Sequence, residues 1–128
     1  MARMQINFHL YAENVSRAAL FYGQNFGFKL EGQIEADKEN GWAALRAENA
    51  LLWLSPQGAK TGLIILIDEK LEELVLQLKH IGTTVLIPEE LNKDQLKEND
   101  ILTTEWGRHS WMLDSEDNVV MLFEPLAG

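Results

Sequence analysis

The chain opens with alternating apolar and polar residues, in the order Ile6, Asn7, Phe8, His9, Leu10 and Tyr11. A period of two residues is typical of a β-strand, because successive side chains point to opposite faces. We therefore predict a first strand here, with Asn7 and His9 on the same face.

After this strand the apolar spacing becomes that of a helix. Apolar and aromatic residues recur at Val15, Ala18, Ala19 and Tyr22. Asn14 suits the N-cap, because its side-chain oxygen accepts a backbone N–H of the first turn, and Gly27 suits a left-handed helix end. We expect a helix between these two residues. Three strand-like segments follow, at 28–34, 42–46 and 50–54.

The second half of the chain repeats this order. An apolar strand at 63–67 precedes a helix that Asp68 or Glu69 can cap and that Gly82 ends. The segments that follow are a strand-like stretch at 83–87, a polar loop at 88–100 with room for a short helix, and strands at 111–113 and 119–123. We predict one domain over residues 1–128, built from repeats at 1–58 and 59–128.

Composition narrows the classes of function. The 128 residues suit one domain, and the absence of cysteine excludes disulfides, thiolate metal sites and a cysteine nucleophile. The net charge of −9 disfavours nucleic acid and would attract a basic ligand or partner, unless it serves only solubility. We find no membrane-spanning run and no signal peptide, so we expect a cytoplasmic protein without a membrane partner.

Two stretches of sequence resemble the vicinal oxygen chelate superfamily, which includes glyoxalases, bleomycin resistance proteins and extradiol dioxygenases. Residues 8–22 and 25–28 are similar to the family's strand, capped helix, Phe-Tyr and Leu-Gly-Phe pattern. Residues 105–107 and 113–120 resemble its Trp-Gly turn and its Asp-Pro-Asp-Gly-Asn hairpin, although serine replaces the proline and aspartate the glycine.

The resemblance implies an α+β fold of two βαβββ modules. Their curled, mixed, mostly antiparallel sheets would surround a cleft, in a homodimer. In the family's enzymes, His, Glu or Gln side chains at four inward positions hold a divalent metal. Here the positions fall on Asn7, Trp53, Gly62 and Met121. Because an amide, an indole, a bare backbone and a thioether are unsuited to that ion, we expect no metal and no cofactor.

The metal-free branch, typified by bleomycin resistance proteins, binds drugs without altering them. Trp42 and Trp106 match positions where that branch carries aromatic residues, and a tryptophan face stacks on planar rings or holds a cation. Trp53 would either fill the space of the metal or form the floor of the cleft. The predicted ligand is an aromatic or basic small molecule, and the predicted ligand-binding side chains are Asn7, His9, Trp42, Trp53, Trp106, Met121 and Glu124.

Other interpretations stay open at this stage. His9 is either a hydrogen-bonding group of the cleft or an ordinary surface histidine, and Glu124 is either a charge at the cleft mouth or a rim carboxylate. The main alternative function is a divergent metal-dependent lyase or isomerase, similar to glyoxalases or dioxygenases, that uses His9, Glu124 or His109. A further alternative is a regulatory or protein-binding domain. No serine has a recognisable base near it in the sequence, and we expect a solvent-facing His109 and a Trp111 in the core or a dimer interface.

Overall fold

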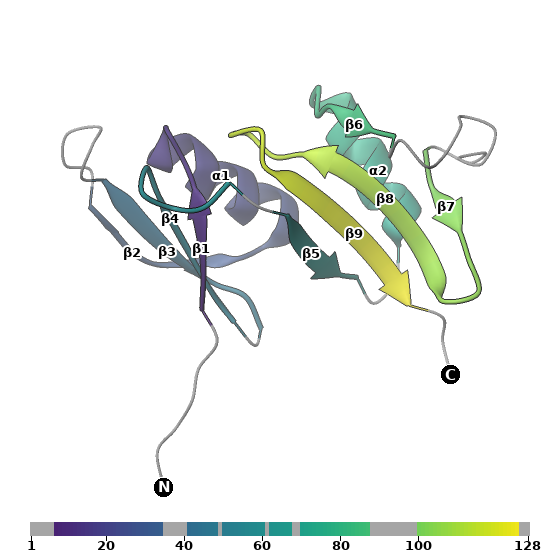
Figure 1. Ribbon diagram of the computed structural model, residues 1–128, viewed down its shortest axis with the longest axis horizontal. Coiled ribbons are helices and arrows are strands. Elements are labelled where there is room, and N and C mark those ends of the chain that lie inside the picture. Colours follow the sequence, from purple (N-terminus) through teal and green to yellow (C-terminus); the bar gives the residue numbers. More distant parts are fainter. Residues whose placement is uncertain are drawn as a thin grey trace, which may run out of the picture. The chain divides into compact units, whose positions relative to one another are not determined.

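The computed structural model describes residues 7–34, 41–48, 50–60, 62–67, 70–87 and 100–125. The chain divides into two compact units, Met1–Thr61 and Gly62–Gly128, close to the predicted boundary between repeats. In the described residues, each unit holds one helix and one mixed sheet (Figure 1). The predicted α+β class is confirmed.

The first unit follows the predicted order of strand, helix and three strands. Its elements are β1 (Asn7–Tyr11), α1 (Val15–Phe26), β2 (Lys29–Ile34), β3 (Trp42–Arg46) and β4 (Leu51–Ser55). The strands lie in the order β1-β4-β3-β2, with β1 and β4 parallel and the other pairs antiparallel.

Both predicted ends of α1 are confirmed. Asn14 Oδ1 accepts the backbone N–H of Arg17 at 3.0 Å, and Gly27 takes the left-handed conformation with φ of 70°. The apolar face of the helix covers one side of the sheet. The buried side chains of this layer include Leu10, Val15, Ala18, Tyr22, Leu45, Leu52 and Leu54. Helix α1 leaves the opposite side of the sheet uncovered.

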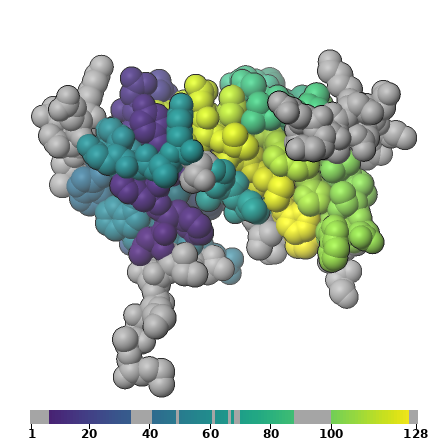
Figure 2. Space-filling model, viewed as in Figure 1, coloured from purple at the N-terminus to yellow at the C-terminus, as the bar shows by residue number. Residues whose placement is uncertain are grey.

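The second unit contains β5 (Leu63–Leu66), α2 (Leu71–His80), β6 (Val85–Leu86), β7 (Leu102–Thr103), β8 (Gly107–Leu113) and β9 (Val119–Pro125). The strand order is β5-β9-β8-β6, and β7 pairs with β8. As in the first unit, the first strand lies parallel to the last. Strands β8 and β9 form a continuous surface in Figure 2.

The start of α2 differs from the prediction. Lys70 stands at the N-cap position with φ of 68° and makes no side-chain capping bond, whereas Asp68 and Glu69 lie outside the described residues. The first-turn N–H of Leu71 instead donates to Glu124 Oε2 at 3.4 Å. The helix end is thus capped by a strand far away in sequence, which local sequence rules cannot detect.

In the second unit, the strand and the loop predicted directly after α2 differ from the structure or lie outside the described residues. The strand predicted at 83–87 is reduced to the two residues of β6, and β7 was not predicted. The loop predicted at 88–100 lies outside the described residues except for Asp100. Neither α1 nor α2, the helices of the described part, is long and apolar enough to cross a bilayer.

Candidate functional site

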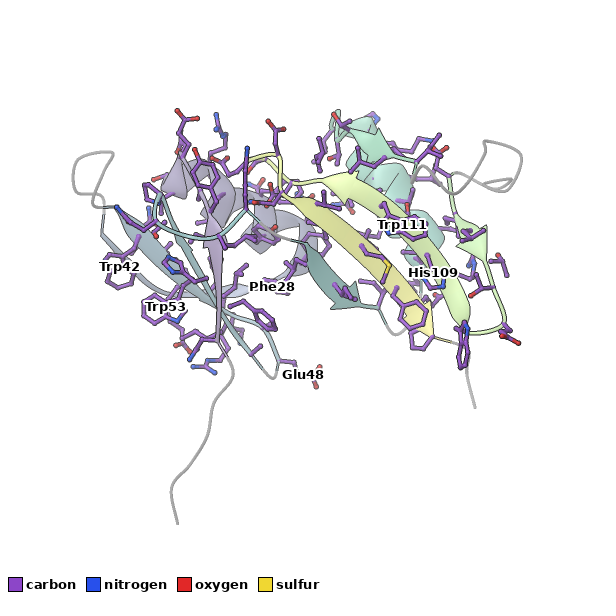
Figure 3. All side chains as sticks on the ribbon, in the orientation of Figure 1. Phe28, Trp42, Glu48, Trp53, His109 and Trp111 are labelled. Carbon is purple, nitrogen blue, oxygen red and sulfur yellow. The ribbon has the colours of Figure 1, made fainter. Side chains whose placement is uncertain are left out.

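Two tryptophans share the face of the first sheet that α1 leaves uncovered. Trp53 lies opposite His9 in the β1–β4 register and opposite Ala44 in the β3–β4 register. Cross-strand partners point to the same face, and Trp42, two residues before Ala44, therefore joins them. The ring centroids of Trp42 and Trp53 are 5.4 Å apart, with the planes inclined at 45° (Figure 3). We call these two residues the tryptophan pair.

Small residues allow the tryptophan pair to lie close to the sheet. Gly32 faces Ala44 across β2 and β3, and a Cβ atom at Gly32 would come within 3.2 Å of the Trp42 ring. The Trp42 indole therefore covers the bare backbone of Gly32. Both indoles are half-buried, so part of each ring stays accessible to a ligand.

His9 lies next to the tryptophan pair and is held by a serine. Its Nε2 atom is 2.6 Å from Ser55 Oγ, which also accepts the backbone N–H of Gln57 at 3.2 Å. Ser55 is buried, whereas His9 is exposed. Asn7, also exposed, stands two residues before His9 on the same face. The first unit thus brings together four of the predicted site residues.

The charged side chains described on the first sheet include an ion pair and a lysine over an aromatic ring. Arg46 forms an ion pair with Glu31, and its hydrogen bond lowers the pKa of the Glu31 carboxyl, while Glu31 raises the pKa of Arg46. Lys60 Nζ lies 5.3 Å from the centre of the Tyr11 ring, in cation–π geometry.

The net negative charge of the chain is confined to the second unit. Residues 1–61 contain six Lys+Arg and six Asp+Glu, whereas residues 62–128 contain five Lys+Arg and 14 Asp+Glu. The net charge of −9 therefore belongs to the second unit, and the unit that carries the tryptophan pair is neutral. This distribution weakens the argument that overall acidity selects a basic ligand for the tryptophan pair.

The second unit has an aromatic cluster of its own, on the side of the sheet away from α2. His109 stacks on Phe123 at a centroid distance of 4.6 Å and on Trp111 at 5.8 Å. Its Nε2 atom lies 3.0 Å from Thr104 Oγ1, and burial lowers the pKa of the imidazole. Met121 faces Trp111 across β8 and β9 and shares this side of the sheet.

Sequence reasoning did not foresee this cluster, because it depends on the pairing of β8 with β9. The family resemblance placed Met121 at an inward position of the last strand, but it did not show which ring of β8 lies opposite Phe123. His109 is half-buried rather than solvent-facing.

The remaining two predicted site residues lie elsewhere in the second unit. Trp106 is 71% exposed in the turn between β7 and β8, where Thr104 Oγ1 accepts its backbone N–H at 3.2 Å. Glu124 points to the helix side of the sheet, with Oε1 3.4 Å from Arg108 Nη1. It therefore lies on the opposite face from Met121.

Arg108 joins this strand to the helix. It pairs with Glu124 and also with Glu72 in the first turn of α2. Burial on its own would lower the pKa of Arg108, but hydrogen bonds and the charges of the two carboxylates outweigh it and raise that pKa. Through these contacts, Glu124 attaches β9 to the start of α2.

The residues at the four metal positions implied by the resemblance do not fit a divalent ion. Asn7 supplies a weak amide donor, the Trp53 indole packs on Trp42, Gly62 has no side chain and Met121 offers a thioether. Within the described ranges, no group of three His, Asp or Glu side chains is placed to hold a metal. We therefore derive no chemistry through a bound ion.

No protein-family model matches the sequence, and neither does any curated protein. Solved structures match it over almost its whole length. TnmS3, an antibiotic-binding protein from Streptomyces sp. CB03234, is 22% identical with a TM-score of 0.69, over 98% of both chains. The lactoylglutathione lyase from Agrobacterium tumefaciens is 17% identical with a TM-score of 0.67, over 96% of this chain and 92% of the other.

A third match is the oxidase ChaP-H2, 11% identical with a TM-score of 0.73, over 100% of this chain and 98% of the other. The fold is that of the vicinal oxygen chelate superfamily. Vicinal oxygen chelate structures include binding proteins as well as enzymes, so the fold does not choose between these functions. The choice must come from the residues of this chain.

Proposed function

We propose that the protein binds a flat aromatic small molecule on the tryptophan pair and leaves it chemically unchanged. The observation that carries the proposal is the contact of Trp42 with Trp53 on a sheet face that α1 leaves uncovered. The likeness of the chain to TnmS3, an antibiotic-binding protein, supports a small drug-like molecule as the ligand.

The tryptophan pair is suited to recognition by stacking. An aromatic contact contributes about 0.5–1.5 kcal/mol beyond the area that it buries. Since 1.4 kcal/mol corresponds to a tenfold change in affinity, the loss of either ring would weaken binding by about tenfold once the lost apolar area is included.

The donor set supports binding without catalysis. The enzyme alternative needs His9, Glu124 or His109 to replace the missing metal ligands. Within the second unit, however, Glu124 points to the helix side of the sheet and pairs with Arg108, whereas His109 lies on the other side. These two side chains do not converge on one ion.

Titration of the purified protein with the planar compound fluorenone, followed by tryptophan fluorescence, tests the proposal. We expect saturable quenching, and an affinity about tenfold lower in Trp42→Ala and in Trp53→Ala. Leu76→Ala, an exposed position on α2, serves as the control that leaves the affinity unchanged. Circular dichroism of each variant shows whether it has kept its fold.

Two results would overturn the proposal. One is quenching that persists with the same affinity in both folded tryptophan variants. The other is stoichiometric Zn, Ni, Mn or Fe in the purified protein together with a turnover that a chelator abolishes.

A further inference from the structure

We infer that His9 presents a fixed Nδ1–H donor beside the tryptophan pair, so that the preferred ligand is an uncharged planar aromatic with a carbonyl oxygen at its edge. This inference rests on the proposed function, since it names the class of molecule that the same face would select. It replaces the expectation of a basic ligand for this face.

The hydroxyl proton of Ser55 needs an acceptor, and His9 supplies it. Its hydroxyl has one hydrogen, and its Oγ atom already accepts the N–H of Gln57. Among the described residues, the other partner of Oγ is Nε2 of His9 at 2.6 Å. A buried hydroxyl proton without an acceptor costs free energy, so Ser55 donates to His9.

The hydrogen bond from Ser55 fixes the tautomer of the His9 imidazole. A neutral histidine carries its proton on one ring nitrogen and accepts on the other. Because Nε2 accepts from Ser55, the ring proton is on Nδ1. No described residue accepts a hydrogen bond from Nδ1, so this donor is available to a ligand.

His9 lies next to Trp53 on the uncovered face of the sheet. His9 and Trp53 are partners in the parallel β1–β4 register, and adjacent strands lie about 4.8 Å apart. The two side chains are therefore neighbours on one face, and His9 is exposed. A ring stacked on the indole would thus lie beside the His9 imidazole, whose Nδ1–H prefers an oxygen acceptor.

The balance of charge around this face agrees with an uncharged ligand. The first unit has no net charge, and the nearby Glu31 carboxylate is neutralised by Arg46. A cation would gain little from this face, and it would be repelled by the Nδ1–H dipole at close range.

Fluorenone and fluorene form a matched pair of probes, because they share the tricyclic frame and differ by one carbonyl group. In the wild-type protein we expect fluorenone to bind about 3- to 10-fold more tightly, the range for one neutral hydrogen bond. In His9→Phe, which keeps a flat ring without the donor, the ratio should fall to about 1. His80→Phe makes the same change at an exposed position near the end of α2 and should keep the wild-type ratio.

The tautomer has a readout that needs no ligand. NMR shifts of the ring nitrogens should show the proton of His9 on Nδ1 in the wild type and a mixture of both tautomers in Ser55→Ala. A wild-type proton on Nε2 would overturn the inference, and so would a fluorenone-to-fluorene ratio that His9→Phe leaves unchanged.

The outcomes separate this inference from the proposed function. Equal affinities of the two probes for the wild type, with both lost in Trp42→Ala, would refute the carbonyl preference and leave the aromatic site standing. Failure of both probes to bind would refute the two together.

Discussion

At the residue scale, the fold alters the titration of His109. Burial against Phe123 and Trp111 lowers its pKa below the ordinary value of 6.5. The folded chain therefore takes up this proton less readily than the unfolded chain. The resulting stabilisation is complete above pH 6.5 and is lost as the pH falls through the lowered pKa.

The substitution His109→Phe tests this effect and keeps an aromatic ring in the cluster. Chemical denaturation at about pH 8 and about pH 5 gives the free energy of unfolding of wild type and variant. We expect the wild type to lose more stability between the two pH values than His109→Phe does. Equal losses would show that the titration of His109 is not coupled to folding.

Single residues also show where sequence reasoning reached its limit. Alternation along β1 correctly placed His9 on the face of Asn7, because that inference needs only a period of two. The partner of His9 is Ser55, 46 residues away, and no local pattern links the two. The ring stack of His109 was missed for the same reason, since it depends on the register between strands.

At the scale of elements, Gly58 controls how the segment after β4 meets β1. Ala59 forms a bridge with Leu10, and a Cβ atom at Gly58 would lie 2.2 Å from the carbonyl oxygen of Leu10. The clash is with backbone, which cannot turn aside as a side chain does. Gly58→Ala should therefore lower the free energy of unfolding by about 1–3 kcal/mol.

Denaturant melts of Gly58→Ala and Gly23→Ala check this prediction. A Cβ atom at Gly23 would meet its nearest neighbour at an ordinary 3.6 Å, and alanine is favoured over glycine inside α1, so Gly23→Ala should keep or raise the stability. If both variants were equally stable, the close approach at Gly58 would have no energetic weight.

Glu124 supplies a second prediction at this scale. It accepts the N–H of Leu71 and pairs with Arg108, both at 3.4 Å, so Glu124→Gln should cost about 1 kcal/mol of stability. Because these contacts lie on the helix side of the sheet, we expect fluorenone affinity to stay unchanged. A loss of affinity without a loss of stability would mean that Glu124 takes part in ligand binding, as the sequence predicted.

The elements themselves were largely predictable. Helix α1 has its cap and its terminating glycine in the local sequence, β1 follows from apolar alternation, and strands such as β5 and β9 follow from short apolar runs. The start of α2 was not predictable, because Glu124 of β9 serves it across the fold. Strand β7 has two residues, too few for any period to show.

At the scale of the whole molecule, the two units share a topology but not a charge. The net charge of −9 lies entirely in residues 62–128, which a total for the chain conceals. Since the tryptophan pair belongs to the neutral unit, electrostatic attraction should contribute little to binding there. Acridone, which is neutral, and proflavine, which is cationic, provide tricyclic probes of this point.

We expect proflavine affinity to change less than about threefold when salt rises from about 0.05 M to about 0.5 M, and acridone affinity to stay constant. Fluorescence titration at the two salt concentrations measures both. A tenfold fall for proflavine alone would mean that the acidic unit takes part in binding the ligand.

The fold class was accessible from sequence because two motifs and a repeat agree with it. The metal positions were equally informative, since the residues at Asn7, Trp53 and Met121 are chemically unlike a metal site. What the sequence could not provide is the arrangement of aromatic side chains, which follows from strand register. Function rests on that arrangement, because the shared fold includes enzymes and binding proteins alike.

The most direct test of the central claim is an NMR titration of the indole N–H signals of the four tryptophans with fluorenone in the presence of a chelator. Single Trp→Phe variants assign the signals. The account predicts that the signals of Trp42 and Trp53 shift together to saturation and that fluorenone is recovered unchanged. Unmoved signals for both residues while the ligand binds, or conversion of the ligand that the chelator stops, would contradict it.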